Sequence, residues 1–503
     1  MIETITGNPT KSEKGNKAAR FPAYTPIIDD QARKILTKLR NKYGDPYRYG
    51  KNGKITGFNE RFWAGVIKEE SLLVYEPDLA MFWIYNPATG IYSRATREYI
   101  RELIGDRIFQ AAKDENKPEI RNLVTIGRLD TIVKALVGIA ERREFFADRP
   151  SSIHLANGMV LASESGLEFE DGFNPEYRSR NSSPFSYNPD ATCDRFHNEL
   201  LIPMLPNPED RIVLQKWLGL ALSGDNPAQR ILLFDGTPGR GKGVIQRIFT
   251  GIVGRQNSTE LRTSHLGERF EINRFVGRTL LHASDVPGDF LMQKWASILK
   301  SLVGGDYLDT EAKGSNESHE ITGNFNVMIV SNTRLRCRLD GDAGAWRRRL
   351  IILRTESPPV EKRIPNFERA LLRVEGDGIL QWALEGYHMA LKDLNECGDL
   401  ILSQEQQKRV DGLLAESNAL EIFVRDSIRR STGSATTVDD ILSAFAEYCA
   451  DRGWQMSPQA QLQRALTDLM LQYHQAAKSN SIKTSDGTKR GFRGITISNG
   501  EPE

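Results

Sequence analysis

A glycine-rich segment at residues 236–243 has the residue types and spacing of a phosphate-binding loop. It follows a short apolar run, 231–234, and precedes a helical pattern at 244–249. Glycines let the backbone curl so that successive N–H groups face phosphate oxygens, and the helix N-terminus adds partial positive charge. The segment predicts a site for the phosphates of ATP, made by Gly236, Thr237, Pro238, Gly239, Arg240, Gly241, Lys242 and Gly243.

The residue after the lysine departs from the usual motif. Lys242 is expected to reach the β- and γ-phosphates, and a serine or threonine normally follows it to ligate Mg²⁺. Here the next residue is Gly243. The metal would then keep an additional water or take the hydroxyl of Thr237 as a ligand.

Two further apolar strands end in polar residues. The run 279–283 is followed by Ser284 and Asp285, and the run 325–331 is followed by Asn332. An acid at such a strand end can hold Mg²⁺ and polarise the attacking water, and an amide can orient that water. We predict Asp285 as the metal ligand, with Asp289 as the alternative, and Asn332 as a sensor of the terminal phosphate.

Three consecutive arginines, Arg347, Arg348 and Arg349, precede the apolar strand 350–353. An arginine presented by a neighbouring subunit stabilises charge on a transferring phosphoryl group. Arg348 is the first choice for this role and Arg349 the second, and the role requires an oligomer. The alternative is a cluster of surface salt bridges.

The chain of 503 residues is long enough for three or four domains. We expect a multidomain α+β protein: a disordered tail (1–25), a mixed pre-motor domain (26–192), an α/β P-loop ATPase core of AAA+ type (193–356), a helical segment with a linker or exposed helix (357–416), and a winged-helix-like domain (417–503). No apolar run approaches the roughly 18 residues of a spanning helix, and the N-terminus has no secretory pattern, so a cytoplasmic protein without membrane contact is expected.

Charge is nearly balanced over the whole chain, with 67 Lys and Arg against 66 Asp and Glu, so only local clusters bear on nucleic acid. Residues 33–54 hold eight basic side chains and a single acid, with three tyrosines among them. Basic groups neutralise phosphates and tyrosine rings stack on bases. The alternative is a solvated helix face followed by a polar loop.

The order of these motifs resembles that of superfamily 3 helicases, specifically the phage and plasmid primase–helicase family related to the poxvirus primase–helicase. The segments 299–306 and 311–314 are similar to that family's Gly-Gly-Asp region and the lysine after it. The resemblance implies a hairpin that projects into a ring channel, with Lys313 gripping DNA. It also implies a C-terminal winged helix whose wing, bearing Lys489, Arg490 and Arg493, contacts phosphates; a packing or protein-interaction module is the alternative.

The resemblance implies an ATP- and Mg²⁺-dependent DNA helicase that works as a ring, expected to be a hexamer, in replication of a phage, plasmid or genomic island. Its DNA would be single-stranded or forked, with origin duplex a further option, and a separate primase or host replication proteins are candidate partners. Only about 60 residues precede residues 60–190, the part that is similar to the family's pre-motor domain, and the sequence shows no paired-carboxylate polymerase motif and no zinc-binding cysteine set. Priming by this chain is therefore not expected. The alternatives are a protein-remodelling ATPase and an origin-binding initiator that only binds ATP.

Overall fold

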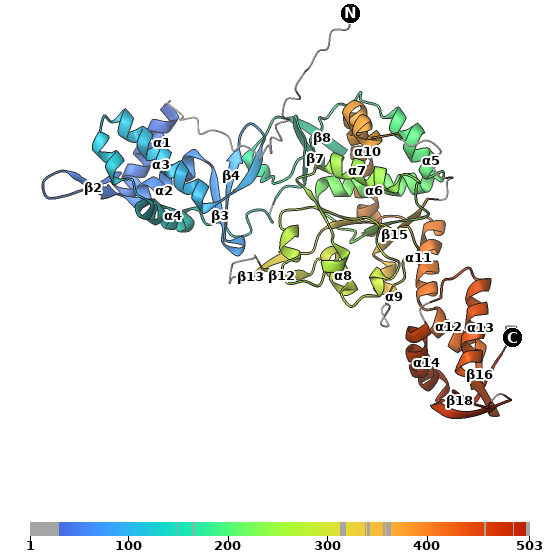
Figure 1. Cartoon of the computed structure of the whole chain (residues 1–503). Coiled ribbons are helices and arrows are strands. Elements are labelled where there is room, and N and C mark those ends of the chain that lie inside the picture. The colour runs from blue at the N-terminus through green and yellow to red at the C-terminus, as the bar shows by residue number, and fades with distance from the viewer. Residues whose placement is uncertain are drawn as a thin grey trace, which may run out of the picture. The chain divides into compact units, whose positions relative to one another are not determined.

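The computed structural model describes residues 30–147, 149–163, 166–311, 318–337, 339, 343–355, 358, 364–456, 459–485 and 487–498. The predicted tail at 1–25 lies outside them. The chain forms two compact units (Figure 1): one holds the residues up to Arg149 together with Phe173–Arg180, and the other holds Pro150–Gly172 and everything from Asn181 onward.

The first unit packs helices and short antiparallel strands around an apolar core. Trp63, Ile104 and Ile132 lie at its centre, each almost fully buried. Two of these strands, β4 and β5, form a hairpin and pair in antiparallel register. The elements are α1 (Asp30–Tyr43), β1 (Tyr47–Tyr49), β2 (Ile55–Phe58), α2 (Glu60–Glu70), β3 (Leu73–Glu76), η1 (Pro77–Leu79), β4 (Met81–Asn86), β5 (Ile91–Ala95), α3 (Arg97–Asp114), η2 (Pro118–Leu123), α4 (Ile126–Ala140) and η3 (Pro175–Tyr177).

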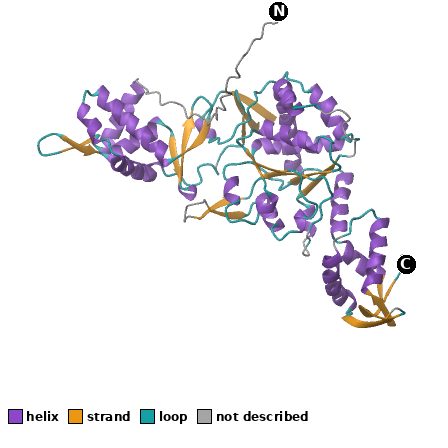
Figure 2. Cartoon of the chain, in the orientation of Figure 1, coloured by secondary structure: helices purple, strands orange, loops and turns teal. Residues whose placement is uncertain are grey.

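A parallel sheet is the centre of the second unit (Figure 2). Its strands lie in the order β10-β11-β14-β9-β15 and all four pairings are parallel. Because both faces of such a sheet are covered, its inner strands are largely apolar rather than alternating. The bounds are β9 (Ile231–Asp235), β10 (Ser258–Glu260), β11 (Leu280–Ala283), β14 (Asn326–Val330) and β15 (Leu350–Arg354).

The two faces of the sheet belong to two different cores, since successive side chains of a strand point to opposite faces. Leu232 and Phe234 pack with α6, α7 and α10, whereas Ile231 and Leu233 pack with α8, α9 and α11. The helices are η4 (Phe196–Leu201), α5 (Ile202–Met204), α6 (Pro208–Ser223), α7 (Lys242–Val253), η5 (Thr263–His265), η6 (Ile272–Phe275), η7 (Phe290–Met292), α8 (Ala296–Gly304), α9 (Ala343–Arg347), α10 (Phe367–Cys397) and α11 (Gln404–Ser417).

Two smaller antiparallel sheets belong to the same unit. One is formed by β6 (Ser152–His154), β7 (Gly158–Ser163) and β8 (Gly166–Asp171). The other is the hairpin of β12 (Tyr307–Glu311) and β13 (Ser318–Thr322). The resemblance implies a hairpin in this region, and β12 and β13 form the two strands of one.

The last part of the chain runs helix, strand, two helices and two strands. Its sheet has the order β16-β18-β17 and is antiparallel, with Phe423, Phe445 and Phe492 in the core beneath it. The return strand predicted at 491–495 lies within β18. The elements are α12 (Ala419–Ser427), β16 (Ile428–Thr437), α13 (Val438–Asp451), α14 (Gln459–His474), β17 (Lys478–Thr484) and β18 (Gly487–Ile497).

The segment 403–416, for which the sequence predicts either a linker or an exposed helix, forms the helix α11. Val410, Leu413 and Leu414 face the apolar core below the sheet, and Ser403 and Gln406 form a capping box at its start. Across the described ranges, no helix combines the length and apolar character that crossing a bilayer requires.

Candidate functional site

The glycine-rich segment forms a loop between the end of β9 and the start of α7. Gly236, Gly239 and Gly241 have φ of 136°, 82° and 86°, values that favour glycine. Gly241 is the N-cap of α7, which begins at Lys242. Among the described residues, the backbone N–H groups of residues 239–243 donate no hydrogen bond. A turn of this kind at a helix start suits an anion.

Gly236 is required by a close neighbour. A Cβ at this position would lie 2.4 Å from Oγ1 and 2.7 Å from the carbonyl oxygen of Thr355. Thr355 is held in place because its N–H donates to the Asp235 carbonyl at 3.0 Å. Its own carbonyl accepts a 2.8 Å bond from the Arg240 guanidinium. The residue after β15 therefore buttresses both ends of the loop.

Lys242 is buried in the loop, with 4% of the residue exposed. Its Nζ donates to the carbonyl oxygens of Gly236 at 2.6 Å and Thr237 at 2.8 Å. Burial lowers the pKa of this ammonium group, whereas the negative charges of Asp235 and Asp285 act in the opposite direction. The cation is thus held by neutral carbonyls, with carboxylates near enough to influence it.

Asp285 and Asn332 come together at the ends of β11 and β14. Asn332 Nδ2 donates to Asp285 Oδ1 at 2.7 Å, and both residues are exposed. Asp285 has φ of 51°, an uncommon left-handed conformation for a residue other than glycine. Asp289, the alternative acid, is also exposed, and it accepts a bond from Gln293 at 3.3 Å.

A buried polar link that the sequence analysis did not identify joins α7 to β11. Gln246 lies one turn after Lys242 and is 3% exposed. Its Nε2 lies 2.9 Å from Nδ1 of His282, and its Oε1 accepts a 2.7 Å bond from Ser284, the residue before Asp285. Burial lowers the pKa of His282. The link holds the helix that carries the lysine against the strand that leads to the acid.

The three arginines lie at the other end of the sheet. The N–H of Ile231, at the start of β9, donates to the Arg349 carbonyl at 2.6 Å, whereas the loop follows the end of β9. Five strand residues separate these edges, which corresponds to roughly 13 Å along a strand. The arginines therefore lie on the edge of the sheet opposite the loop of their own chain.

The environments of the three arginines differ. Arg347 is ion-paired with Asp411 of α11. Arg349 is 6% exposed and donates to the Ala345 carbonyl at 3.1 Å. Arg348 is exposed, and its side chain forms no ion pair or hydrogen bond with the residues that the structure describes. Of the two predicted fingers, Arg348 is the one presented at the surface.

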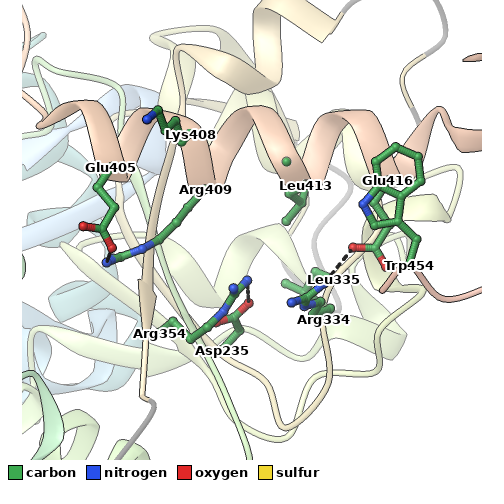
Figure 3. A pocket seen from close by; sticks show the side chains of 11 residues that line it. Asp235, Arg334, Leu335, Arg354, Glu405, Lys408, Arg409, Leu413, Glu416 and Trp454 are labelled. Atoms are coloured by element: carbon green, nitrogen blue, oxygen red, sulfur yellow. Dashed lines mark hydrogen bonds and ion pairs between the residues drawn. The ribbon is translucent and has the colours of Figure 1, made fainter. Parts of the chain in front are cut away.

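A pocket lies at the carboxyl edge of the sheet beneath α11 (Figure 3). Asp235 and Arg354, the last residues of β9 and β15, pair across 3.1 Å, and α11 covers them. Arg409 of α11 is fixed by Asp210 at 2.7 Å and by Glu405 at 2.9 Å. The charges are largely paired with one another. Sequence reasoning missed this cluster because its members come from segments far apart in the chain.

The residues predicted to bind DNA are separated from this site along the chain. Lys313 lies outside the described residues. Lys489 and Arg490 are exposed on β18 beside the β17–β18 turn, and Lys489 lies 3.9 Å from Asp439. Arg493 is exposed and donates to the Ser481 carbonyl at 3.2 Å.

Comparison with known proteins gives limited matches. A family described only as a family of unknown function (DUF5906) matches residues 234–349, from the last apolar residue before the loop to the third arginine. No curated protein is significantly similar in sequence to the chain.

Solved structures of the C-terminal region of NrS-1 match most of the chain at low sequence identity. An apo A form of residues 305–718 of that protein is 11% identical, covering 86% of this chain and 98% of its own, with a TM-score of 0.47. A second A form is 12% identical with a TM-score of 0.43, covering 84% and 96%. A further apo structure is 12% identical with a TM-score of 0.46, covering 86% and 98%.

Proposed function

We propose that the chain is an ATP-driven DNA helicase that assembles as a ring, most simply a hexamer, and serves replication of a mobile genetic element. One observation carries the proposal. Lys242, Asp285 and Asn332 gather at the carboxyl edge of a parallel sheet, whereas Arg348 is exposed at the opposite edge. A nucleotide site completed by an arginine then needs a second subunit.

The residues of the loop fit a nucleotide with its metal. Open N–H groups at 239–243, the start of α7 and a buried lysine together suit a polyphosphate. Mg²⁺ in such sites keeps several waters and takes only one or two protein ligands, and Asp285 supplies one. A Cβ at Gly243 would meet only the end of the Arg247 side chain, at 3.3 Å. The missing hydroxyl therefore leaves room for a water.

The roles of the chain's own groups follow from these positions. Bound ATP–Mg²⁺ supplies the phosphoanhydride bond whose cleavage releases energy. Lys242 exchanges the carbonyls of Gly236 and Thr237 for phosphate oxygens. Asp285 holds the metal side of the site, and Asn332 orients its carboxylate through their 2.7 Å hydrogen bond. Arg348 of the next subunit balances the negative charge that grows on the transferring group.

Substitution of Lys242 tests the enzymatic part of the proposal. In Lys242→Ala, DNA-stimulated ATP hydrolysis should fall roughly 10²- to 10³-fold, the usual effect of removing one charge-stabilising donor, and strand displacement should cease. Arg247→Ala, on the same helix with a 54% exposed side chain, is the matched control and should retain both activities. Unwinding retained by Lys242→Ala would overturn the helicase mechanism.

Mixing variants tests the ring. Subunits carrying Arg348→Ala keep an intact loop, and subunits carrying Lys242→Ala keep an intact arginine. If the arginine acts on the neighbouring loop, a mixture should recover part of the ATPase activity that each variant lacks alone. No recovery from a mixture that has been shown to co-assemble would contradict action between subunits.

The absence of a hydroxyl at Gly243 favours one rival, an initiator that binds ATP without hydrolysing it. Steady-state hydrolysis in the presence of Mg²⁺ separates the two, because an initiator of this kind shows none.

A further inference from the structure

The basic segment near the N-terminus is used by neither the ATP site nor the C-terminal surface. From Arg33 to Lys54 it holds eight basic residues and one acid, Asp45, a local net charge of +7 (8 − 1). In the structure this segment becomes α1 and the β1–β2 hairpin of the first unit. The hairpin extends from the helical part of that unit (Figure 1).

The base of the hairpin is anchored in the core. Tyr47 is 4% and Phe58 3% exposed, and the Trp63 indole donates to the Pro46 carbonyl at 3.0 Å. Asn59 ties the same region to the end of α1, donating to the Tyr43 carbonyl at 2.7 Å and to the Asp45 carbonyl at 2.9 Å. The base is therefore ordered, and the tip is held at a defined place on the unit.

The tip of the hairpin is exposed and carries two lysines. Lys51, Asn52, Gly53 and Lys54 are all exposed, and Gly53 turns the chain at φ of 72° with no atom within 4 Å of an added Cβ. No ion pair is described for Lys51 or Lys54 within the described ranges. Open backbone between two lysines permits close approach of a phosphate chain.

The two tyrosines of the first strand have different roles. Tyr47 is buried and its hydroxyl lies 3.2 Å from Glu115, which makes it part of the core. Tyr49 is 52% exposed and lies between Arg48 and the lysines of the tip. An exposed ring flanked by cations is the arrangement by which proteins stack on the bases of single strands.

A solubilising surface would mix charges of both signs. Elsewhere on this unit solvent-accessible charges of both signs are paired: Arg143 with Glu141 at 3.2 Å, and Arg101 with Asp130 at 3.2 Å. Among the described basic residues of the hairpin, only Arg48 has an acidic partner, Glu60, contributed by α2. Like charges held together without partners repel one another, and an anionic ligand relieves that repulsion.

We propose that the β1–β2 hairpin binds single-stranded DNA, with Lys51 and Lys54 on the phosphates and Tyr49 stacked on a base. This contact is additional to the proposed helicase function and independent of it, since neither the ATP loop nor the C-terminal basic residues take part.

The test measures binding of a fluorescein-labelled oligo(dT) to the full chain by fluorescence anisotropy, without nucleotide and with EDTA, over a series of salt concentrations. Removing two phosphate contacts in Lys51→Ala/Lys54→Ala should reduce the slope of log K against log salt by about 1.4, at about 0.7 per contact on single strands. Lys113→Ala/Lys134→Ala removes two exposed lysines from α3 and α4 of the same unit and should leave the slope unchanged.

Tyr49→Ala gives a second, charge-neutral readout. Loss of one stacked base should weaken binding roughly 5- to 100-fold, and Tyr49→Phe should restore it. The same substitution should leave binding of a duplex nearly unaltered. Equal slopes for the hairpin and control variants, or a Tyr49→Ala effect as large on duplex as on oligo(dT), would overturn the proposal. Because no ATP is present, failure here leaves the helicase proposal untouched.

Discussion

The two edges of the central sheet are built in different ways. At the carboxyl edge, polar groups are fixed by the chain itself: Lys242 by two carbonyls, Asp285 by Asn332, and Asp235 by Arg354. At the amino edge, Arg348 is exposed without a described partner in the chain. A preorganised half and an open half on opposite edges are what the proposed ring would need, because each subunit would meet its neighbours through two different surfaces.

Substitutions at the two edges should therefore differ in their effects on stability and activity. A change at the carboxyl edge disturbs neighbours within the subunit, so it should alter stability as well as activity. A change of Arg348 removes no side-chain hydrogen bond or ion pair among the described residues, so it should alter activity alone. Each prediction below tests this distinction.

The largest effect is expected for Arg348→Ala. Arginine fingers contribute about 10³–10⁵ in kcat, so DNA-stimulated ATP hydrolysis should fall by at least roughly 10³-fold while the melting temperature stays within error. Arg347→Ala is the matched control, because its exposed ion pair with Asp411 should be worth less than about 1 kcal/mol. Thermal unfolding and steady-state hydrolysis are measured on the same samples.

Arg349 sharpens this comparison. Its guanidinium is buried and donates to the Ala345 carbonyl. Arg349→Ala should therefore lower the stability of the fold, and its loss of activity should follow from that destabilisation. Full activity in Arg348→Ala, together with a selective loss in a well-folded Arg349→Ala, would transfer the finger role to Arg349.

Strand ends were the part of the site that sequence could predict. The apolar runs before Asp235, Asp285 and Asn332 are strongly patterned, and parallel strands bring such ends to one edge of a sheet. The short polar strand β10 (Ser258–Glu260) and the polar β16 (Ile428–Thr437) were not predicted, because pairing rather than composition makes them strands.

Contacts distant in sequence were the part that could not be predicted. The Gln246–His282 link and the Asp235–Arg354 pair join residues 36 and 119 positions apart. Nothing in local spacing marks either one. Similarly, three adjacent arginines look equivalent in sequence, and only the fold gives them separate environments, with Arg347 paired with Asp411 and Arg349 buried and bonded to the Ala345 carbonyl.

Two loop glycines provide the next prediction. Gly236→Ala places a methyl group 2.4 Å from Thr355 Oγ1 at a φ of 136°, so it should destabilise the fold by about 1–3 kcal/mol. Gly243→Ser meets only the flexible end of Arg247 and should change stability by less than about 0.5 kcal/mol. Chemical denaturation of both variants gives the comparison.

Activity separates the same pair further. Gly243→Ser supplies the hydroxyl that Mg²⁺ normally takes beside the lysine, so half-maximal hydrolysis should need less Mg²⁺. Similar destabilisation by both substitutions would show that the loop is not packed against Thr355 in the way described.

The smallest effect is expected from pH, and only at the carboxyl edge. Burial lowers the pKa of His282 below its ordinary value of 6.5, so the folded state favours the neutral ring. As pH falls through 6.5 the unfolded chain binds the proton more readily, and this contribution to stability is lost. Protonation would also set an N–H of the ring against the Gln246 amide, 2.9 Å away.

The melting temperature of the wild type should therefore decrease on acidification, and His282→Asn should remove part of that decrease. His265, whose side chain is 42% exposed, provides the control: His265→Asn should leave the pH dependence as in the wild type. If His282→Asn and wild type respond equally to acid, the link between α7 and β11 does not hold the carboxyl edge together.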